Sequence, residues 1–563
     1  MITTPALVTR DAAIRLPRVA LWVVTALYLL PGLFGRDPWR NAELTAYGLM
    51  LAIAEGRTAW LNPTLAGLDL QASLPAHWLG AGSILLLEPL GISAPLAARL
   101  PFAFLLGVNL MLVWYAAYRL ARTEAALPLA FAFGGEAAPR DYARSLADGA
   151  VLAFMATLGV LQLGHESTPE IIQLTSVSLL LWSLATPAHR GWQAGVTAMA
   201  ALLLMSASGA APVALALGLA ALGVCLRSAD PALAPMRWWI AAGAVLAALV
   251  AFALGSWRLQ VDFPDEALEV LQALRLLAWF TWPTAPLAMI TVWRWRRQVM
   301  RRHVAVPALL ALLCTAHALL AGGSDRALLL AVPGIAVLAA FALPTLSRSA
   351  SAAVDWFSVF FFSGLALAVW VIYLSLQIGW PPQPARNAAA VAPDYQAVFE
   401  PMMLVLGLLG TWAWFWLVRW RTARHRQALW KSLVLPACGV LLNWLLAMTL
   451  LLHPLDYTRS LTPWIASLQR PIGLANCIAA PAMPVAYAAA LEAQGRWVVD
   501  ARPTAGTDSS CEVLMLTEAR DGSVPQMAGW RFQERVRRPT ERYFAAHIFR
   551  RESAEPLPPA AAR

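Results

Sequence analysis

The stretch AHWLGAGSILLLEPLGI, residues 76–92, decides how the rest of the chain is oriented. It is apolar over nearly the length of a membrane span, but His77, Glu88 and Pro89 interrupt it. If it crossed the membrane, every later loop would change sides and most arginines would lie outside the cytoplasm. Because basic residues favour the cytoplasmic side of short loops, we predict that this stretch is an amphipathic helix on the outer membrane surface.

The composition indicates that the chain as a whole lies in a membrane. Hydrophobic residues make up 59% of the 563 residues, charged residues make up 13%, and the mean hydropathy is +0.60. A soluble domain carries about 25% charged residues, so this chain cannot cover a water-facing surface of normal size. The net charge of +10 comes in short bursts between apolar runs, which argues against nucleic-acid binding.

About thirteen apolar runs approach the length of roughly 17–25 residues that a membrane span needs. They cover residues 19–35, 97–118, 148–164, 170–186, 191–207, 209–226, 236–256, 276–295, 305–322, 326–344, 355–379, 398–418 and 432–453. With the N-terminus inside, the cytoplasmic loops receive most of the arginines, including Arg10, Arg15 and Arg18. The outer side then receives a long first loop (36–96), an acidic fourth loop (257–275) and the tail. Asp262, Asp265, Glu266 and Glu269 form the acidic cluster in the fourth loop.

The sequence of the tail, from residue 454 onward, predicts a small α/β domain outside the membrane. We expect a transmembrane domain over 1–453, an α/β appendage over 454–551 and a disordered Pro/Ala-rich tail over 552–563. A helix is predicted over 480–494, and strands over 497–500, 511–517, 530–538 and 543–550. Cys477 and Cys511 lie in this tail, and a disulfide between them is expected if it is outside the cytoplasm.

The segment FGRDPWRNAEL, residues 34–44, directly follows the first span. A carboxylate beside lipid is costly unless it is used or paired, so Asp37 is a candidate general base for an acceptor hydroxyl or amine. The alternative is a helix start, with Asp37 as the N-cap, Pro38 in the first turn, and a surface pair between Arg40 and Glu43.

The pattern Asp37-x-x-Arg40-x-Ala42-Glu43 resembles the signature of GT-C glycosyltransferases of the protein-mannosyltransferase and ArnT-like group. Three further segments agree with it: LPAHWL at 74–79, ARLP at 98–101, and GGSDR at 322–326 followed by Val332 and Pro333. The resemblance implies a thirteen-span enzyme with interfacial helices in the first outer loop and a periplasmic C-terminal domain. It also implies a bacterial inner-membrane protein that moves a sugar from a polyprenyl-phosphate carrier to a lipid, glycan or protein acceptor.

Two features depart from that pattern. Pro38 stands where many relatives have a second carboxylate, and the lysine that relatives place before the 74–79 segment is missing. Arginines would then have to hold the carrier phosphate, and their planar fork suits phosphate oxygens.

The second outer loop, GHESTPE at 164–170, contains the second acidic candidate. Glu170 fits the position where relatives carry an acid, and Glu166 is its close rival. His165 and Glu166 could also hold a divalent metal, although no cofactor is required by the sequence. A plain helix start at Thr168 and Pro169 is the alternative.

The resulting hypothesis is a membrane glycosyltransferase with a polyprenyl-phosphate sugar as donor. Its alternatives are a transporter or flippase for a lipid-linked substrate, and a catalytically silent subunit of the same fold. The candidate catalytic residues are Asp37, Glu43 and Glu170, and the candidate substrate-binding residues are Arg40, Arg57, His77, Arg99, His165, Glu166 and Arg326.

Overall fold

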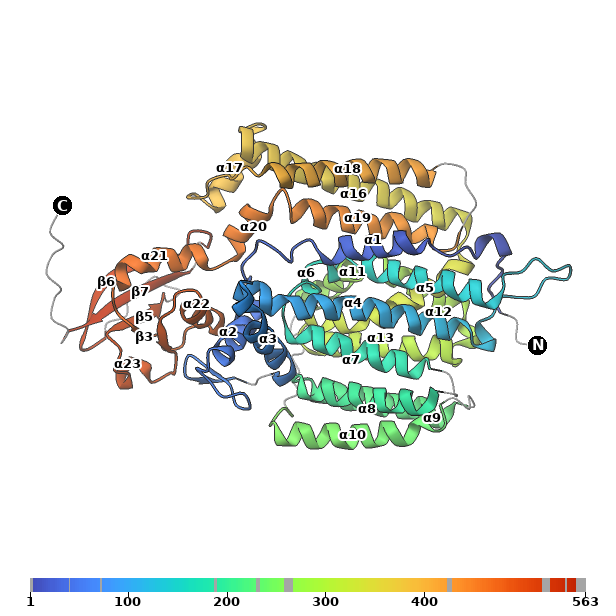
Figure 1. The fold of residues 1–563 in the computed structure, drawn as a ribbon, viewed down its shortest axis with the longest axis horizontal. Helices are drawn as coiled ribbons and strands as arrows, with labels where there is room; N and C mark the ends of the chain where they lie inside the picture. Colours follow the sequence, from blue (N-terminus) through green and yellow to red (C-terminus); the bar gives the residue numbers. More distant parts are fainter. Residues whose placement is uncertain are drawn as a thin grey trace. The chain divides into compact units, whose positions relative to one another are not determined.

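The computed structural model of the chain describes residues 4–39, 41–70, 73–186, 190–228, 233–257, 267–422, 428–518, 527–541 and 544–552. Arg40, the acids at 262, 265 and 266, and the predicted disordered tail from 553 onward lie outside the described residues. Two compact units are present (Figure 1). The first comprises Met1–Phe34, Leu100–Trp370 and Glu400–Leu450, and the second comprises Gly35–Arg99, Val371–Phe399 and Leu451–Arg563.

The first unit is built from helices, with α4 and α16 each contributing most of their length to it. Its helices are α1 (Arg18–Leu29), α4 (Ala94–Ala121), α5 (Pro139–Ala156), α6 (Val160–Leu163), α7 (Pro169–Leu184), α8 (Gly191–Ala207), α9 (Ala211–Arg227), α10 (Met236–Ala253), α11 (Ala267–Phe280), α12 (Thr284–Arg294), α13 (Arg302–Leu320), α14 (Asp325–Leu328), α15 (Val332–Ala342), α16 (Arg348–Ile378), α18 (Pro401–Thr422) and α19 (Lys431–Ala447).

Every predicted apolar run contains a helix, and the predicted class of polytopic helical membrane protein is confirmed. Among the described residues, six helices are long and apolar enough to cross a membrane, or eight if each of two bent pairs is one span. The count of thirteen spans remains a prediction. The predicted span 276–295 is divided between α11 and α12, which meet at 89°. Pro283, which has no backbone N–H to continue a helix, stands at this break.

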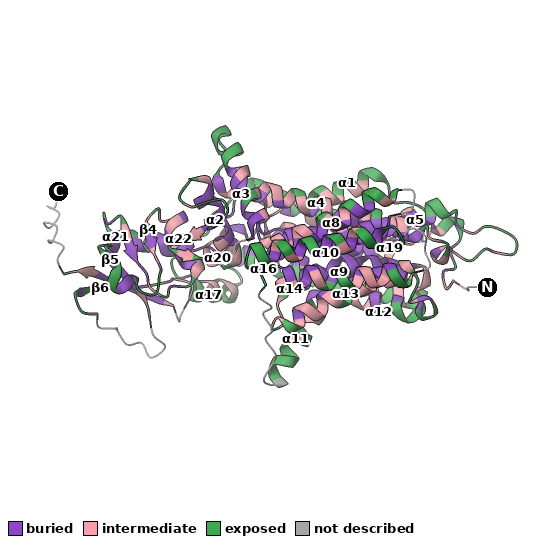
Figure 2. Ribbon diagram, turned by 90° about the horizontal axis from the view of Figure 1, so that it is seen from below, coloured by how far each residue is buried: buried purple, intermediate pink, exposed green. Residues whose placement is uncertain are grey.

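Buried residues, drawn in purple, run through the helices of the first unit (Figure 2). Helix α15 is buried over its whole length and contacts α5, α12 and α13. Helices α8 and α10 approach closely, because a Cβ at Gly243 would lie 2.9 Å from the Cα of Met199. Some polar side chains form hydrogen bonds between helices, as is common in membrane proteins. The Asn109 amide, for example, donates to the Thr175 hydroxyl at 2.9 Å.

The second unit combines residues 35–99 and 371–399 with the C-terminal tail. Its helices are α2 (Ala42–Ala54), α3 (Leu74–Leu87), α17 (Pro382–Val391), α20 (Leu452–Arg459), α21 (Thr462–Ile472), α22 (Val485–Ala493) and α23 (Ala505–Asp508). Helix α2 packs against both α3 and α22. Helix α3 corresponds to the stretch 76–92. Its 14 residues extend about 21 Å, which is too short for a hydrocarbon core of about 30 Å.

The predicted strands of the tail are present in a five-stranded sheet with the order β4-β3-β5-β7-β6. Strand β3 pairs in parallel with β4 and β5, whereas β7 pairs antiparallel with β5 and β6. The strands are β3 (Cys477–Ala479), β4 (Val498–Asp500), β5 (Val513–Thr517), β6 (Trp530–Arg537) and β7 (Ala545–Arg551), with a separate hairpin of β1 (Thr64–Leu65) and β2 (Leu68–Asp69). Strand β3, α20 and α21 were not predicted. The structure pairs Cys477 with Cys511 in a disulfide, with the two Cα atoms 4.9 Å apart.

Candidate active site

Asp37 lies in an extended segment before α2, not at a helix start. The helix begins at Ala42 after Asn41, so the predicted N-cap at Asp37 is wrong. The Oδ2 atom of Asp37 accepts hydrogen bonds from the hydroxyls of Ser460, at 2.9 Å, and Thr462. Its Oδ1 atom accepts no hydrogen bond from any described residue. One carboxylate oxygen is therefore fixed while the other can face a substrate.

Asp456 forms hydrogen bonds to the segment that contains Asp37. Its Oδ1 atom accepts from the backbone N–H of Asp37 and from the indole N–H of Trp39, both at 3.0 Å. Burial, followed by the negative charge of Asp37, raises the pKa of Asp456. The sequence analysis missed Asp456, Ser460 and Thr462, all of which come from α20 and the start of α21.

Glu43 is fully buried between two guanidinium groups. Arg36 binds it bidentately, with N–O distances of 2.6 and 3.0 Å, and the Arg99 Nε lies 3.4 Å from its Oε1. Its Oε2 also accepts from the backbone N–H of Trp39 at 2.9 Å. Burial alone would raise the pKa of Glu43, but Arg36 and Arg99 outweigh it and hold the pKa at about 2.

These contacts correct two predicted roles. A carboxylate that is fully buried and bound by two guanidinium groups is not placed to exchange a proton with a substrate, so we propose that Glu43 is a positioning residue. Glu43 is buried, not on the surface as predicted, and its predicted partner Arg40 lies outside the described residues. Arg99 is 2% exposed, and its other nitrogens donate to the carbonyls of Arg36 and Asp37 at 3.4 and 3.3 Å. Its guanidinium therefore forms hydrogen bonds within the protein and is not available to bind a carrier phosphate.

A second layer of contacts supports α20 from the sheet. The buried Arg538, just after β6, donates to the carbonyls of Thr458 and Ser460 at 3.0 and 3.4 Å. Glu541 pairs with Arg538 at 2.7 Å and also accepts from the hydroxyl of Tyr487. The guanidinium groups of Arg36 and Arg459 both lie over the Trp39 ring. The C-terminal tail thus positions the segment that contains Asp37.

Arg57 and His77 are not among the residues that contact Asp37. Arg57 follows α2 and pairs with Glu55 and Glu492, at 2.7 and 3.1 Å. A helix of 13 residues is about 20 Å long, so Arg57 lies at the end of α2 that is remote from Glu43. His77 is 3% exposed, and burial lowers its pKa to about 4, which leaves a neutral imidazole inside the α2–α3 pair.

The other predicted residues form a separate group in the first unit. Arg326 pairs with Glu166 at 2.5 Å and with Glu170 at 3.7 Å. Glu166 is buried and also accepts from the Gln162 amide at 2.8 Å. The side chain of Glu170 is 22% exposed, against 3% for Glu166. Of the two rivals, Glu170 is therefore the more accessible carboxylate.

His165 has a structural environment. Its Nδ1 and Nε2 atoms lie 2.7 Å from the carbonyl oxygens of Leu161 and Tyr28, and its ring packs against Tyr28 and Trp444. Both ring nitrogens therefore lie beside backbone oxygens of the protein itself, in a packed environment rather than in an open site. In the described part of the chain, no group of three His, Cys, Asp or Glu side chains could hold a metal ion.

No family model matches the sequence, and a comparison with curated proteins finds no match either. Solved structures do match. ArnT from Cupriavidus metallidurans bound to undecaprenyl phosphate superimposes with a TM-score of 0.60 and 14% identity, covering 94% of this chain and 97% of that one. Its apo state matches with a TM-score of 0.56 and 14% identity, covering 94% and 96%. This chain therefore has a fold similar to that of ArnT.

Proposed function

We propose that this protein is a glycosyltransferase of the bacterial inner membrane that uses a polyprenyl-phosphate sugar as donor. The observation that carries the proposal is the arrangement of Asp37, with Oδ2 bound by two hydroxyls, its backbone N–H held by Asp456 and Oδ1 open. A general base must be held within reach of the proton that it accepts. The similar fold of an ArnT that binds undecaprenyl phosphate supports the choice of donor.

In the proposed reaction, an acceptor hydroxyl or amine attacks the anomeric carbon of the carrier-linked sugar. Asp37 Oδ1 accepts the proton of the acceptor as the new bond forms. The bond between the anomeric carbon and the phosphate oxygen breaks, and the polyprenyl phosphate leaves with the bonding electrons. The configuration at the anomeric carbon inverts, since the acceptor attacks from the side opposite to the phosphate.

Cationic groups would stabilise the phosphate that departs. Among the residues that the structure describes, Arg326 is the candidate for this role. Its side chain pairs with Glu166 and Glu170 and is still 23% exposed. The resemblance to GT-C enzymes also implies a phosphate-binding role for Arg40. This role stays a prediction, because Arg40 lies outside the described residues. Glu170 is the proposed second acid, and we place the N-terminus in the cytoplasm and the α/β tail in the periplasm.

An apolar cavity of about 810 Å³ between α11, α12, α13 and α15 offers space for part of a lipid chain. Leu274, Met289, Leu312 and Ile335 are among the side chains that line it. Binding the chain of the carrier here would fix the position of the reacting phosphate, which lowers the entropic cost of the transfer.

The proposal is tested by incubating the purified protein, in proteoliposomes, with a panel of polyprenyl-phosphate sugars and a membrane extract as acceptor. We expect one donor to yield free polyprenyl phosphate and a glycosylated acceptor with inverted anomeric configuration. If no donor turns over while labelled lipid-linked sugar crosses the bilayer, the chain is instead a transporter. If neither occurs, the silent-subunit alternative is favoured.

A further inference from the structure

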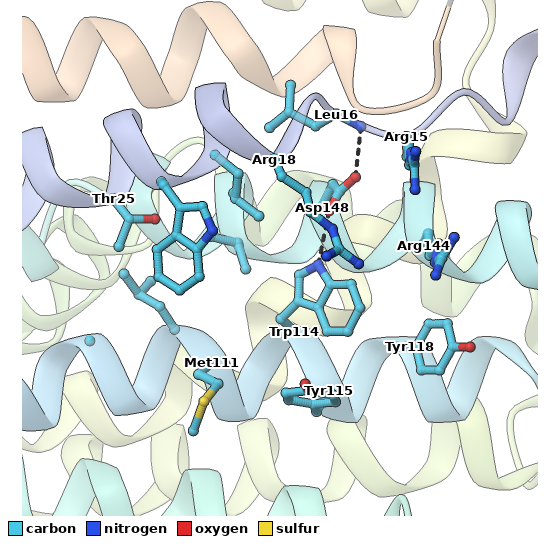
Figure 3. Close-up of a pocket in the computed structure, with 15 residues that line it drawn as sticks. Arg15, Leu16, Arg18, Thr25, Met111, Trp114, Tyr115, Tyr118, Arg144 and Asp148 are labelled. Atoms are coloured by element: carbon cyan, nitrogen blue, oxygen red, sulfur yellow. Dashed lines mark hydrogen bonds between the residues drawn. The ribbon is translucent and has the colours of Figure 1, made fainter.

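A second cavity in the first unit has no part in the proposed transfer. It has a volume of about 480 Å³ and lies between the segment before α1, α1 itself, α4 and α5 (Figure 3). One end is polar, where Arg15, Arg144 and Tyr118 are placed, and Thr25 and Met111 line the other end (Figure 3). The cavity is therefore amphipathic along its length.

The polar end is positively charged. Arg15, Arg18 and Arg144 line it together with a single acid, Asp148. Both oxygens of Asp148 are engaged: Oδ2 accepts from the backbone N–H of Leu16 at 2.8 Å, and Oδ1 accepts from the Trp114 indole at 2.9 Å. Within the described part of the chain, none of the three arginines forms an ion pair. Three guanidinium groups against one committed carboxylate leave an excess of two positive charges at this end.

The remaining walls face lipid. Trp22 and Met111 line the cavity and are 72% and 50% exposed. Met111 lies on α4, a 28-residue helix that is long enough to cross the bilayer. Exposed apolar side chains on such a helix contact acyl chains, and tryptophan and tyrosine favour the boundary between lipid and water. A molecule in this cavity can therefore be continuous with the bilayer.

We propose that this cavity binds an anionic phospholipid, with the headgroup phosphate between Arg15, Arg18 and Arg144 and the upper acyl chain along Trp22 and Met111. Basic pockets between membrane helices on the cytoplasmic side suit anionic headgroups, and arginine binds phosphate oxygens in a bidentate manner. Arg15 and Arg18 precede the first predicted span, so with the N-terminus in the cytoplasm, as proposed above, this lipid belongs to the cytoplasmic leaflet. This inference does not depend on the proposed glycosyl transfer.

The test is lipid binding to the full-length protein by native mass spectrometry in detergent, with added phosphatidylglycerol or phosphatidylcholine. We expect phosphatidylglycerol to bind more tightly, and the double variant Arg18→Gln/Arg144→Gln to weaken it by about tenfold or more. The matched control is Arg140→Gln, an exposed arginine on α5 that does not line the cavity, and it should change the affinity less than twofold. If the double variant aggregates, Arg144→Gln alone gives the same direction.

Three results would overturn the proposal. Equal binding of the two phospholipids would remove the anionic requirement, and equal effects of the cavity and control variants would place the lipid elsewhere. Displacement of the bound lipid by millimolar inorganic phosphate would show that the cavity binds free phosphate. Displacement by undecaprenyl phosphate but not by phosphatidylglycerol would show that it binds the polyprenyl carrier.

Discussion

The carboxylate of Asp456 accepts a hydrogen bond from the backbone N–H of Asp37 at 3.0 Å, across 419 residues of sequence. The same oxygen accepts from the Trp39 indole, so a helix of the C-terminal tail fixes the segment that carries the proposed base. We infer that the tail is required for catalysis as a positioning element.

Replacing Asp456 with Ala should lower kcat about tenfold while the KM for the donor changes little, because one to two hydrogen bonds that orient Asp37 are lost. Asp456→Asn keeps an acceptor oxygen and should retain most of the activity. Steady-state kinetics of both variants, each checked for an unchanged melting temperature, measures this difference. Equal losses in the two variants, or a loss confined to KM, would contradict a positioning role.

Replacing Glu43 with Ala should destabilise the protein by about 3–5 kcal/mol, since it leaves Arg36 and Arg99 buried without their counter-charge. Denaturant unfolding followed by far-UV circular dichroism checks this. Asp69→Asn, at an exposed carboxylate of the same loop, is the control and should be neutral. A Glu43→Ala variant as stable as this control would mean that the buried pairs contribute little.

The low pKa of Glu43, about 2, predicts an acid-dependent loss of stability. Because the pKa is lower in the folded than in the unfolded state, Glu43 stabilises the protein above its unfolded pKa of about 4.5. This contribution disappears as the pH falls toward 2. The melting temperature of the wild type should therefore fall more steeply than that of Glu43→Gln between pH 5 and pH 3. Parallel curves would show that Glu43 is not held ionised in the folded protein.

Glu170 and Glu166 should respond differently to substitution. Glu170→Gln should lower kcat by at least about tenfold with an unchanged melting temperature, as expected for an accessible acid or base. Glu166→Gln should lower the melting temperature, because Glu166 is buried against Arg326. Measuring both quantities for both variants separates the roles, and the reverse pattern would make Glu166 the functional acid.

Breaking the Cys477–Cys511 disulfide should destabilise the α/β tail by about 3–4 kcal/mol, as expected for a loop whose ends are 34 residues apart. Cys477→Ser and chemical reduction of the wild type should lower the melting temperature of the tail equally. Cys314→Ser replaces a buried cysteine outside the tail, so reduction should lower the melting temperature of this variant as much as it lowers that of the wild type. An unchanged melting temperature after reduction would refute this contribution.

The membrane class, the helices in the apolar runs and the strands β4, β5, β6 and β7 of the tail could be predicted from local properties of the sequence. The roles of Glu43 and Arg99 could not, because a motif gives spacing but not burial. Asp456 was missed even though the argument that singled out Asp37 applies to it: it is a carboxylate close behind the last predicted span. Its partner is fixed only by the tertiary fold, which the span pattern does not encode. The environment of His165 did not follow from the sequence either, because the carbonyls beside its ring nitrogens belong to helices α6 and α1, whose packing no side-chain pattern reveals.

The most direct test of the account compares Asp37→Asn with the wild type in the donor assay, using Asp69→Asn as the matched control. Asn keeps an oxygen for Ser460 and Thr462, so the variant should fold normally. We predict that its kcat falls by about 10²–10⁴-fold, the usual contribution of a general base, while the control keeps full activity. Full activity of Asp37→Asn, with inversion at the anomeric carbon preserved, would contradict the assignment of Asp37 as the base.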